Sequence, residues 1–265
     1  MEINRNNIND IVYKSNTKPD KDYGQNFLIE PSISEEITNL LDLDKVDKVL
    51  EVGPGLGSLT HFLAEKCNLT VVDIDCRMID FLTGVYGDKI TYVLDDVRKM
   101  NVSTFDKIIG NLPYNITSEL ILFLLLNASN CQKMVLMCQL EAYNHFADVS
   151  GKEYGPISVL LHLLGNCKKE ITVKAGSFYP VPKCNSIVFT FDYAPICERN
   201  VAIGTYKLAK SLFLNRRKTI YNNLKNHLGN KEKAESILNT LKIDLNKRPE
   251  DLSPSLFLEI YKMIK

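Results

Sequence analysis

The sequence predicts an α/β domain with a largely parallel sheet, followed by a small all-α domain. Three observations support this prediction. Short apolar runs that are typical of buried strands recur between residues 46 and 191, and segments with helical spacing separate them. Polar or glycine residues directly follow several of these runs. From about residue 200 onward, apolar residues recur at helical spacing without further strand-like runs.

These patterns divide the chain into three parts. Residues 1–22 are polar and weakly periodic, so we expect a flexible N-terminal arm. Residues 23–199 form the predicted α/β domain, and residues 200–265 form the helical domain. The chain has no net charge, but residues 200–265 contain 13 Lys/Arg against 6 Asp/Glu. We therefore expect this end of the protein to face a polyanion such as RNA.

The composition is that of an ordinary globular protein, with 45% hydrophobic and 24% charged residues. The longest apolar run, Leu120–Leu126, is too short to cross a bilayer, and the polar segment Met1–Asp10 has no signal core. We therefore expect a cytoplasmic protein that does not bind a membrane. The seven cysteines include no Cys-x-x-Cys pair, so we expect neither a metal site nor a disulfide framework.

A glycine-rich turn follows the first predicted strand, Val46–Val52. Gly53, Gly55 and Gly57 lie in this turn, and a helix is expected to begin near Ser58. Glycine lets the backbone approach a ligand closely, and a helix N-terminus adds partial positive charge. A dinucleotide fingerprint would have its third glycine at position 58. The spacing therefore favours a nucleoside-binding turn over a pyrophosphate site and argues against a nicotinamide-dependent oxidoreductase.

Acidic residues follow the next two predicted strands. Asp73 lies near the carboxyl end of Leu69–Ile74, where a carboxylate can accept hydrogen bonds from both hydroxyls of a ribose. Asp75 competes for this role, because strand alternation places both acids on the same face. Asp95-Asp96 follows Ile90–Leu94, where a carboxylate can accept a hydrogen bond from an adenine amino group. Acid pairs also commonly end strands in simple turns.

The fourth predicted strand, Phe105–Gly110, leads into Asn111-Leu112-Pro113-Tyr114. Pro113 cannot continue a strand ladder, so the chain must turn rigidly here. The Asn111 side-chain oxygen and the Leu112 carbonyl could hold both N–H groups of an exocyclic amine such as N6 of adenine. Tyr114 could stack on the base, which contributes ~1–3 kcal/mol. A strand-ending turn with a core tyrosine is the alternative when this motif is considered alone.

The remaining elements follow from the same patterns. Pro31 and Ser32 begin a helix whose apolar positions share one face. The later part of the α/β domain is expected to contain helices at Thr117–Leu126, Glu141–Phe146 and Ile157–Leu164, a buried strand at Lys133–Gln139, and a closing antiparallel pair at Ile171–Val173 and Ile187–Phe191.

Two further motifs complete an ordered set. Gly24-Gln25-Asn26-Phe27-Leu28 precedes the glycine turn, and Phe178-Tyr179-Pro180-Val181-Pro182-Lys183 follows the Asn111 turn. From about Gly24 to the C-terminus, this set resembles the ribosomal RNA adenine N6-dimethyltransferases, most closely the branch that modifies small-subunit rRNA. The resemblance implies a Rossmann-like methyltransferase domain that uses S-adenosylmethionine. It also implies dimethylation of two adjacent adenosines near the 3′ end of small-subunit rRNA, in ribosome biogenesis.

The resemblance assigns roles to individual residues. Phe178 would be a second stacking ring, with Tyr179 as the alternative, and Asp73 rather than Asp75 would hold the ribose. The turn at Asn111, Leu112, Pro113 and Tyr114 would be catalytic. The donor would contact Asn26, Leu28, Gly53, Gly55, Asp73, Asp96 and Asn111. The cluster Arg216, Arg217 and Lys218 lies at a predicted helix start, where it would contact RNA phosphates.

The expected partner is small-subunit rRNA within a pre-ribosomal small subunit, bound by a monomeric enzyme. The nearest alternative is the erythromycin-resistance branch, which methylates one adenine of large-subunit rRNA. Leu112 and the cluster at residues 216–218 favour the small-subunit branch. A second alternative is a non-enzymatic assembly or transcription factor on the same fold, which the intact Asn111–Tyr114 turn disfavours. Naked RNA and an assembled subunit both remain open as substrates.

Overall fold

The computed structural model describes residues 1–15, 17, 19 and 25–265. The chain forms two compact units. The first comprises Met1–Ala142 and Lys168–Asp192, and the second comprises Tyr143–Cys167 and Tyr193–Lys265. The second unit therefore takes in residues 143–167, which the sequence prediction places in the α/β domain. Gly24, the first residue of the Gly-Gln-Asn-Phe-Leu motif, lies outside the described residues.

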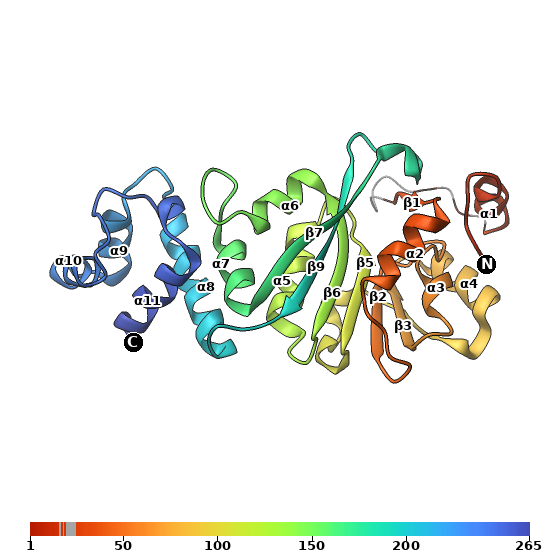
Figure 1. The fold of residues 1–265 in the computed structure, drawn as a ribbon, viewed down its shortest axis with the longest axis horizontal. Helices are drawn as coiled ribbons and strands as arrows, with labels where there is room; N and C mark the ends of the chain where they lie inside the picture. The colour runs from red at the N-terminus through yellow and green to blue at the C-terminus, as the bar shows by residue number, and fades with distance from the viewer. Residues whose placement is uncertain (16, 18, 20–24) are drawn as a thin grey trace. The chain divides into compact units, whose positions relative to one another are not determined.

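The first unit is built on a sheet with the strand order β4-β3-β2-β5-β6-β9-β7 (Figure 1). Strands β4, β3, β2, β5 and β6 are parallel to one another, and β9 is antiparallel to β6. The predicted parallel sheet is thereby confirmed. The strands are β2 (Lys48–Val52), β3 (Asn68–Asp73), β4 (Thr91–Leu94), β5 (Lys107–Asn111), β6 (Lys133–Gln139), β7 (Gly165–Val173) and β9 (Ser186–Tyr193).

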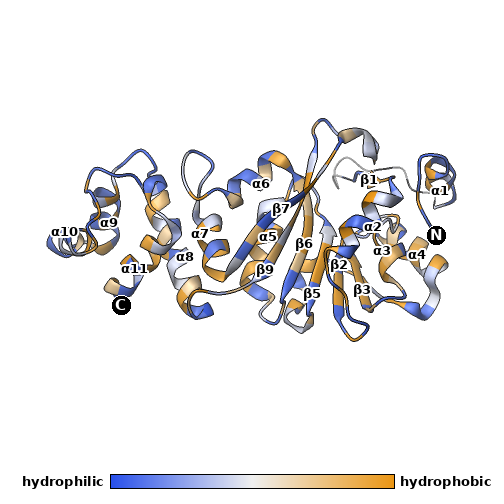
Figure 2. Cartoon of the chain, in the orientation of Figure 1, coloured by the Kyte–Doolittle hydropathy of each residue, from blue (hydrophilic) through white to orange (hydrophobic). Residues whose placement is uncertain are grey.

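Continuous apolar runs make the centre of this sheet. Val49, Leu50 and Val52 of β2 are buried, and so are Ile108 and Ile109 of β5. Figure 2 shows the neighbouring strands β5 and β6 as largely hydrophobic. Parallel strands have this composition because helices cover both of their faces. The helices of this unit are α1 (Ile8–Lys14), α2 (Pro31–Asn39), α3 (Thr60–Leu63), α4 (Cys76–Tyr86) and α5 (Thr117–Asn127).

The parallel arrangement brings the predicted site residues to one edge of the sheet. In the strand register, Val52 is opposite both Val72 and Gly110, and Asp73 is opposite Leu94. The residues that leave these strands therefore lie at a common edge. A separate two-stranded sheet pairs β1 (Phe27–Leu28) with β8 (Phe178–Tyr179) in antiparallel orientation. Ligands of open α/β sheets bind at this kind of edge.

The flexible arm expected for residues 1–22 is contradicted by the first fifteen residues. They contain helix α1, and Ile3, Ile8 and Ile11 are buried in a cluster with Phe27, Leu56 and Met78. Each buried isoleucine stabilises this position by ~1.5–3 kcal/mol relative to an exposed one. Three isoleucines are too few to raise the hydropathy of a polar segment, which explains why the composition predicted an arm.

The second unit is helical. Helix α6 (Leu140–Ala147) leads into it, followed by α7 (Pro156–Leu164), α8 (Arg199–Phe213), α9 (Ile220–Leu228), α10 (Lys231–Thr240) and α11 (Pro254–Ile264). Its core contains Tyr154, Phe213 and Phe257, whose ring centroids lie 5.5 to 6.4 Å apart. Thr219 caps the start of α9, and Gly229 ends it in the left-handed conformation with φ +64°.

Two kinds of feature are absent from residues 1–15, 17, 19 and 25–265. No helix in these ranges has the length and apolar content needed to span a membrane. The same ranges contain no group of three or more His, Cys, Asp or Glu side chains arranged to hold a metal ion.

Candidate active site

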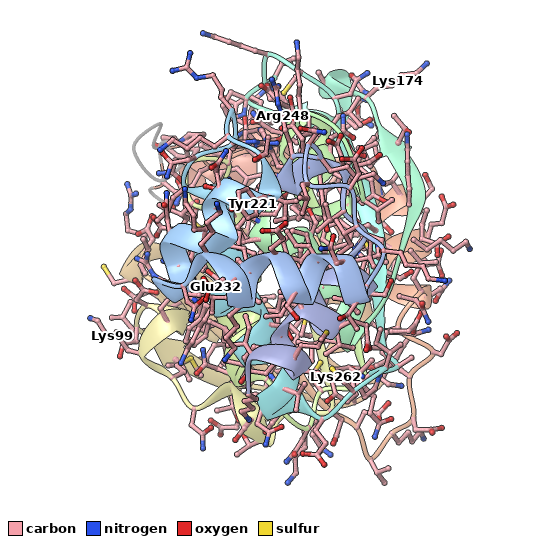
Figure 3. The ribbon with its side chains drawn as sticks, turned by 90° about the vertical axis from the view of Figure 1, so that its left-hand side faces the viewer. Lys99, Lys174, Tyr221, Glu232, Arg248 and Lys262 are labelled. Atoms are coloured by element: carbon pink, nitrogen blue, oxygen red, sulfur yellow. The ribbon has the colours of Figure 1, made fainter. Side chains whose placement is uncertain are left out.

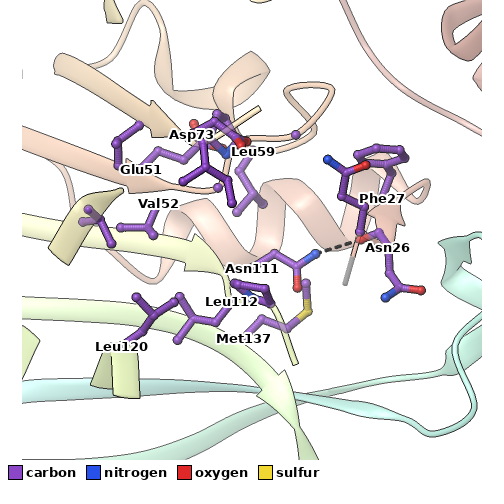
Figure 4. Close-up of a pocket in the computed structure, with 18 of the residues that line it drawn as sticks. Asn26, Phe27, Glu51, Val52, Leu59, Asp73, Asn111, Leu112, Leu120 and Met137 are labelled. Atoms are coloured by element: carbon purple, nitrogen blue, oxygen red, sulfur yellow. Dashed lines mark hydrogen bonds between the residues drawn. The ribbon is translucent and has the colours of Figure 1, made fainter. Parts of the chain in front are cut away.

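A cavity opens at the carboxyl ends of β2, β3 and β5. It contains about 980 Å³ of empty space, its open mouth included. Figure 4 shows residues from several separate segments of the first unit around it. The cavity brings together most of the predicted site residues: Asn26, Leu28, Gly53, Gly55, Asp73, Asn111, Leu112, Pro113 and Tyr114.

The glycine turn forms one wall of the cavity with its backbone. Gly53 and Gly55 have φ values of +67° and +55°, which residues with a side chain rarely adopt. A Cβ atom on Gly55 would lie 3.0 Å from the Phe27 ring. The turn therefore needs glycine both for its conformation and for its close contact with the β1 segment.

Asp73 and Asp75 have different surroundings. Asp73 lines the cavity, and burial raises the pKa of its carboxyl group to about 6. Asp75 caps helix α4 and binds Arg77 through Nε at 2.9 Å and through a terminal nitrogen at 2.6 Å. The side chain of Gln25 also donates to Asp75, at 2.9 Å. These bonds, the one from Arg77 above all, lower the pKa of Asp75. The Asp75 carboxylate is thus occupied by hydrogen bonds from Arg77 and Gln25.

Glu51 is a cavity residue to which the sequence analysis assigned no role. Its carboxyl group is buried at the end of β2 and accepts a hydrogen bond from the Thr60 hydroxyl at 2.7 Å. Burial raises the pKa of Glu51 to about 8. The available signal was an acid between apolar residues of a strand, because such a group is buried only where it has a partner or a function.

Asn111 and Leu112 present two acceptors to the cavity. The Asn111 amide nitrogen donates to the Asn26 carbonyl at 2.9 Å, and the Leu112 backbone nitrogen donates to the Met137 carbonyl at 2.9 Å. Figure 4 shows the first of these bonds. Within the part of the chain that the structure describes, neither Asn111 Oδ1 nor the Leu112 carbonyl accepts a hydrogen bond. Both residues line the cavity.

Pro113 and Tyr114 complete the turn. The Pro113 carbonyl accepts a hydrogen bond from the Thr117 hydroxyl at 2.9 Å, which attaches the turn to the first residue of α5. Tyr114 is half-buried in the cavity wall, and its hydroxyl lies 2.9 Å from the Ser186 hydroxyl. Burial raises the pKa of Tyr114 above its usual value. The ring is therefore neutral at physiological pH and fixed at its far end.

Of the two acids after β4, the one at the cavity is not the one that the resemblance implies. Asp95 lines the cavity, whereas Asp96 is not among the lining residues. The Asp96 carboxylate caps the turn Val97–Lys99 and accepts several bonds from the Arg98 guanidinium, the shortest at 2.6 Å. Arg98 in turn binds Glu119 of α5 at 2.7 Å. The sequence could not rank the neighbouring acids, because side-chain direction in a turn depends on partners distant in the chain.

Phe178 does not lie where the resemblance places it. Its side chain is fully buried in the main core cluster, beside Leu28 in the β1–β8 register, and it does not line the cavity. Tyr179, the alternative, is only partly buried and packs against the cluster around Ile8 and Ile11. A two-residue strand gives no alternation from which its inward side chain could have been predicted.

The three predicted RNA-binding cations in the second unit differ from one another. Arg216 donates to the carbonyls of Gly151 at 3.2 Å and Tyr154 at 2.9 Å, and it binds Glu250 at 3.1 Å. Arg217 and Lys218 are exposed, and within the described residues their side chains form no ion pair. Arg216 therefore links parts of the second unit, whereas the side chains of Arg217 and Lys218 are exposed to solvent.

Further basic residues lie close to Lys218. The Ile220 nitrogen donates to the Lys247 carbonyl at 2.6 Å, which brings the segment before η5 (Pro249–Asp251) next to the start of α9. Lys247 and Arg248 are both exposed. Figure 3 shows Arg248 on the side of the molecule that faces the viewer. Lys247 and Arg248 thus add exposed cations near Lys218, where a nucleic-acid backbone could be contacted.

The sheet order, the glycine turn after β2 and the acid at the end of β3 define a Rossmann-like methyltransferase domain. Two solved structures share the fold. A dimethyladenosine transferase from Plasmodium falciparum has a TM-score of 0.74 at 25% identity, covering 88% of this chain and 95% of that one. The 23S rRNA methyltransferase ErmE has a TM-score of 0.72 at 23% identity, covering 90% of this chain and 99% of that one.

Sequence comparison identifies the family. The model of the ribosomal RNA adenine dimethylase family matches residues 3–265. The chain is 36% identical to the ribosomal RNA small subunit methyltransferase A of Malacoplasma penetrans, over 89% of each chain. It is also 36% identical to the protein of that name from Geobacter metallireducens, over 88% of this chain and 90% of that one. This chain belongs to the ribosomal RNA adenine dimethylase family. The predicted enzyme class, an rRNA adenine dimethyltransferase, is confirmed.

Proposed function

We propose that this enzyme transfers methyl groups from S-adenosylmethionine to N6 of two adjacent adenosines near the 3′ end of small-subunit rRNA. The names of the curated relatives support the small subunit as the substrate. The observation that carries the chemistry is a pair of acceptors on residues that line the cavity, Asn111 Oδ1 and the Leu112 carbonyl, which accept no hydrogen bond from any residue that the structure describes.

The other end of the cavity fits the methyl donor. Asp73, in its ionised form, can accept hydrogen bonds from the two ribose hydroxyls, and the backbone at Gly53 and Gly55 leaves room for a nucleoside. Of the two acids after β4, Asp95 lines the cavity and could accept from the adenine of the donor. Asp96 could do so only with a lone pair that its hydrogen bonds to Arg98 leave free. When bound, the donor supplies a methyl group on a positively charged sulfur.

Asn111 and Leu112 orient the amine that receives the methyl group. N6 of adenine is a poor nucleophile because its lone pair is delocalised into the ring. In the first transfer, two acceptors that hold both N–H groups favour the pyramidal nitrogen, whose lone pair then points toward the donor. In the second transfer, the monomethylated amine has one N–H group, which one of the acceptors holds. The same acceptors stabilise the positive charge that develops on N6. The amine becomes acidic as it is alkylated, so its proton leaves to water and positioning supplies much of the rate.

Tyr114 and the cations of the second unit hold the RNA. The Tyr114 ring, fixed through Ser186, can stack on the extruded adenine. Arg217 and Lys218 supply phosphate contacts, whereas Arg216 holds the loop that presents them. Loss of either phosphate contact weakens binding without changing the chemistry at Asn111.

Methyl transfer from tritiated S-adenosylmethionine to unmethylated small subunits tests the proposal. The labelled nucleoside is identified by mass after digestion, and large subunits and protein-free small-subunit rRNA serve as parallel substrates. We expect N6,N6-dimethyladenosine at two adjacent positions of small-subunit rRNA. Label in large-subunit rRNA alone would identify the erythromycin-resistance activity instead. Donor binding without transfer to any particle would identify a non-enzymatic factor.

A further inference from the structure

The loop Pro180–Asn185, which connects β8 to β9, has no role in the site described so far. The motif Phe178–Lys183 was expected to supply a stacking ring through Phe178, but this side chain is buried in the core. The side chains that the loop does expose are Val181, Lys183, Cys184 and Asn185. Their position relative to the cavity suggests a different use for the segment.

Both ends of the Pro180–Asn185 loop are attached to the cavity wall. On one side, Tyr179 pairs with Phe27, which lines the cavity. On the other side, the Ser186 hydroxyl bonds the hydroxyl of the cavity residue Tyr114 at 2.9 Å. Asn185 Oδ1 also accepts a hydrogen bond from the Ala175 nitrogen at 3.0 Å. The loop therefore begins beside Phe27, which contacts the glycine turn, and ends beside Tyr114, the residue proposed to stack on the target adenine.

Val181 is the exposed apolar residue of this loop. Its side chain is 67% exposed, and the prolines on both sides of it restrict the backbone. The fold gains little from an apolar side chain in water. A rigid loop that presents such a side chain loses little conformational entropy when the side chain is buried against a ligand. Lys183, two residues further on, adds an exposed cation.

We propose that Val181 is a wedge that enters the RNA stack where the target adenosine leaves it, and that Lys183 contacts a phosphate beside that position. The inference rests on the proposed function and adds a positioning residue to it. Extruding a base from its stack is unfavourable, and enzymes that bend or open nucleic acids often insert an apolar side chain at the vacated step. Val181 contacts the flanking bases, and the chemistry stays with Asn111.

The closest matched control is Val46, which is 79% exposed and lies before β2, at the opposite end of the parallel strands. We compare Val181→Ala, Val181→Ile and Val46→Ala. The probe is a small subunit reconstituted with rRNA that carries 2-aminopurine in place of one target adenosine, because this base gains fluorescence on unstacking. Steady-state methyl transfer to unlabelled subunits gives kcat and KM separately, and calorimetry with S-adenosylhomocysteine reports on the donor pocket.

We expect Val181→Ala to reduce the fluorescence gain and kcat about tenfold, the contribution of roughly one stacked base, with unchanged affinity for S-adenosylhomocysteine. Val181→Ile and Val46→Ala should behave as the wild type. Lys183→Gln should reduce the slope of log affinity against log salt by ~0.7–0.9, the value for one phosphate contact.

Each outcome separates this proposal from the proposed function. Wild-type transfer to small subunits together with wild-type fluorescence and kcat in Val181→Ala would overturn the wedge and leave the activity intact. A raised KM with unchanged fluorescence at saturation would show that Val181 contributes to subunit binding without unstacking the base, which also overturns the wedge. Failure of the wild-type enzyme to methylate small subunits would instead overturn the proposed function.

Discussion

The Asn111 side-chain amide donates a hydrogen bond to the Asn26 carbonyl oxygen at 2.9 Å, across 85 residues of sequence. This bond joins the segment before β1 to the turn after β5. It also orients the amide, because the nitrogen donates to Asn26 while the oxygen accepts no hydrogen bond from the described residues. The orientation of the catalytic acceptor therefore depends on a residue that belongs to a different motif.

Replacement of Asn111 by alanine should lower turnover by about 10²–10³, the effect of losing one preorganised polar contact. Affinity for S-adenosylhomocysteine should remain largely intact. Methyl transfer to small subunits and calorimetry measure the two quantities. The exposed Asn226 in the second unit provides a matched asparagine control. Near-normal turnover in Asn111→Ala would remove the proposed role of this turn.

Asp73 and Asp75 should separate donor binding from stability. Asp73→Asn is expected to weaken donor binding about 10–100-fold, because it removes charge-assisted hydrogen bonds to the ribose. Asp75→Asn should instead lower the free energy of unfolding, since it weakens the cap of α4 and the ion pair with Arg77. Calorimetry and urea denaturation distinguish these results. Equal loss of donor affinity in the two variants would contradict the assignment.

The same residue gives donor binding a defined pH dependence. Burial raises the pKa of the Asp73 carboxyl group to about 6, and the group makes charge-assisted hydrogen bonds with both ribose hydroxyls only when it is ionised. Affinity for S-adenosylhomocysteine should therefore fall as the pH drops below about 6 and level off above it. In Asp73→Asn this dependence should disappear. A wild-type affinity that is constant between pH 5 and pH 7 would argue against a ribose contact at Asp73.

Glu51 should make the protein less stable as the pH rises. Its folded-state pKa is about 8 and its ordinary value is 4.5, so between these values the unfolded chain loses this proton while the folded protein retains it. The free energy of unfolding therefore falls across this window. Glu51→Gln should remove the Glu51 contribution to this trend, so that the free energy of unfolding of the variant rises relative to that of the wild type between pH 5 and pH 8 in urea denaturation. Parallel pH profiles would contradict the prediction.

Arg216 and Arg217 are adjacent, but their replacement should affect different properties, stability for Arg216 and RNA binding for Arg217. Arg216→Ala is expected to destabilise the second unit by ~1–2 kcal/mol, because the carbonyls of Gly151 and Tyr154 and the Glu250 carboxylate lose a partly buried partner. Arg217→Ala should leave stability unchanged and reduce the salt dependence of RNA binding by about one phosphate contact. Thermal unfolding and binding titrations at several salt concentrations test both; equal effects on stability would refute the distinction.

Much of the fold could be predicted, because it depends on patterns that are local in sequence. The apolar runs of β2, β5 and β6 and the stop imposed by Pro113 identify the strands and the turn without reference to the rest of the chain. The roles of Phe178 and Arg216 could not be found in this way. The direction of the first follows from its pairing with Leu28, and the partners of the second lie 34 to 65 residues away.

The buried isoleucines of the first eleven residues have a practical consequence. Ile3, Ile8 and Ile11 cover Phe27, Leu56 and Met78. A shortened chain that begins at Gln25 would leave this apolar patch open to water, and such patches promote self-association. Removal of this polar N-terminal segment would therefore lower the solubility of the protein.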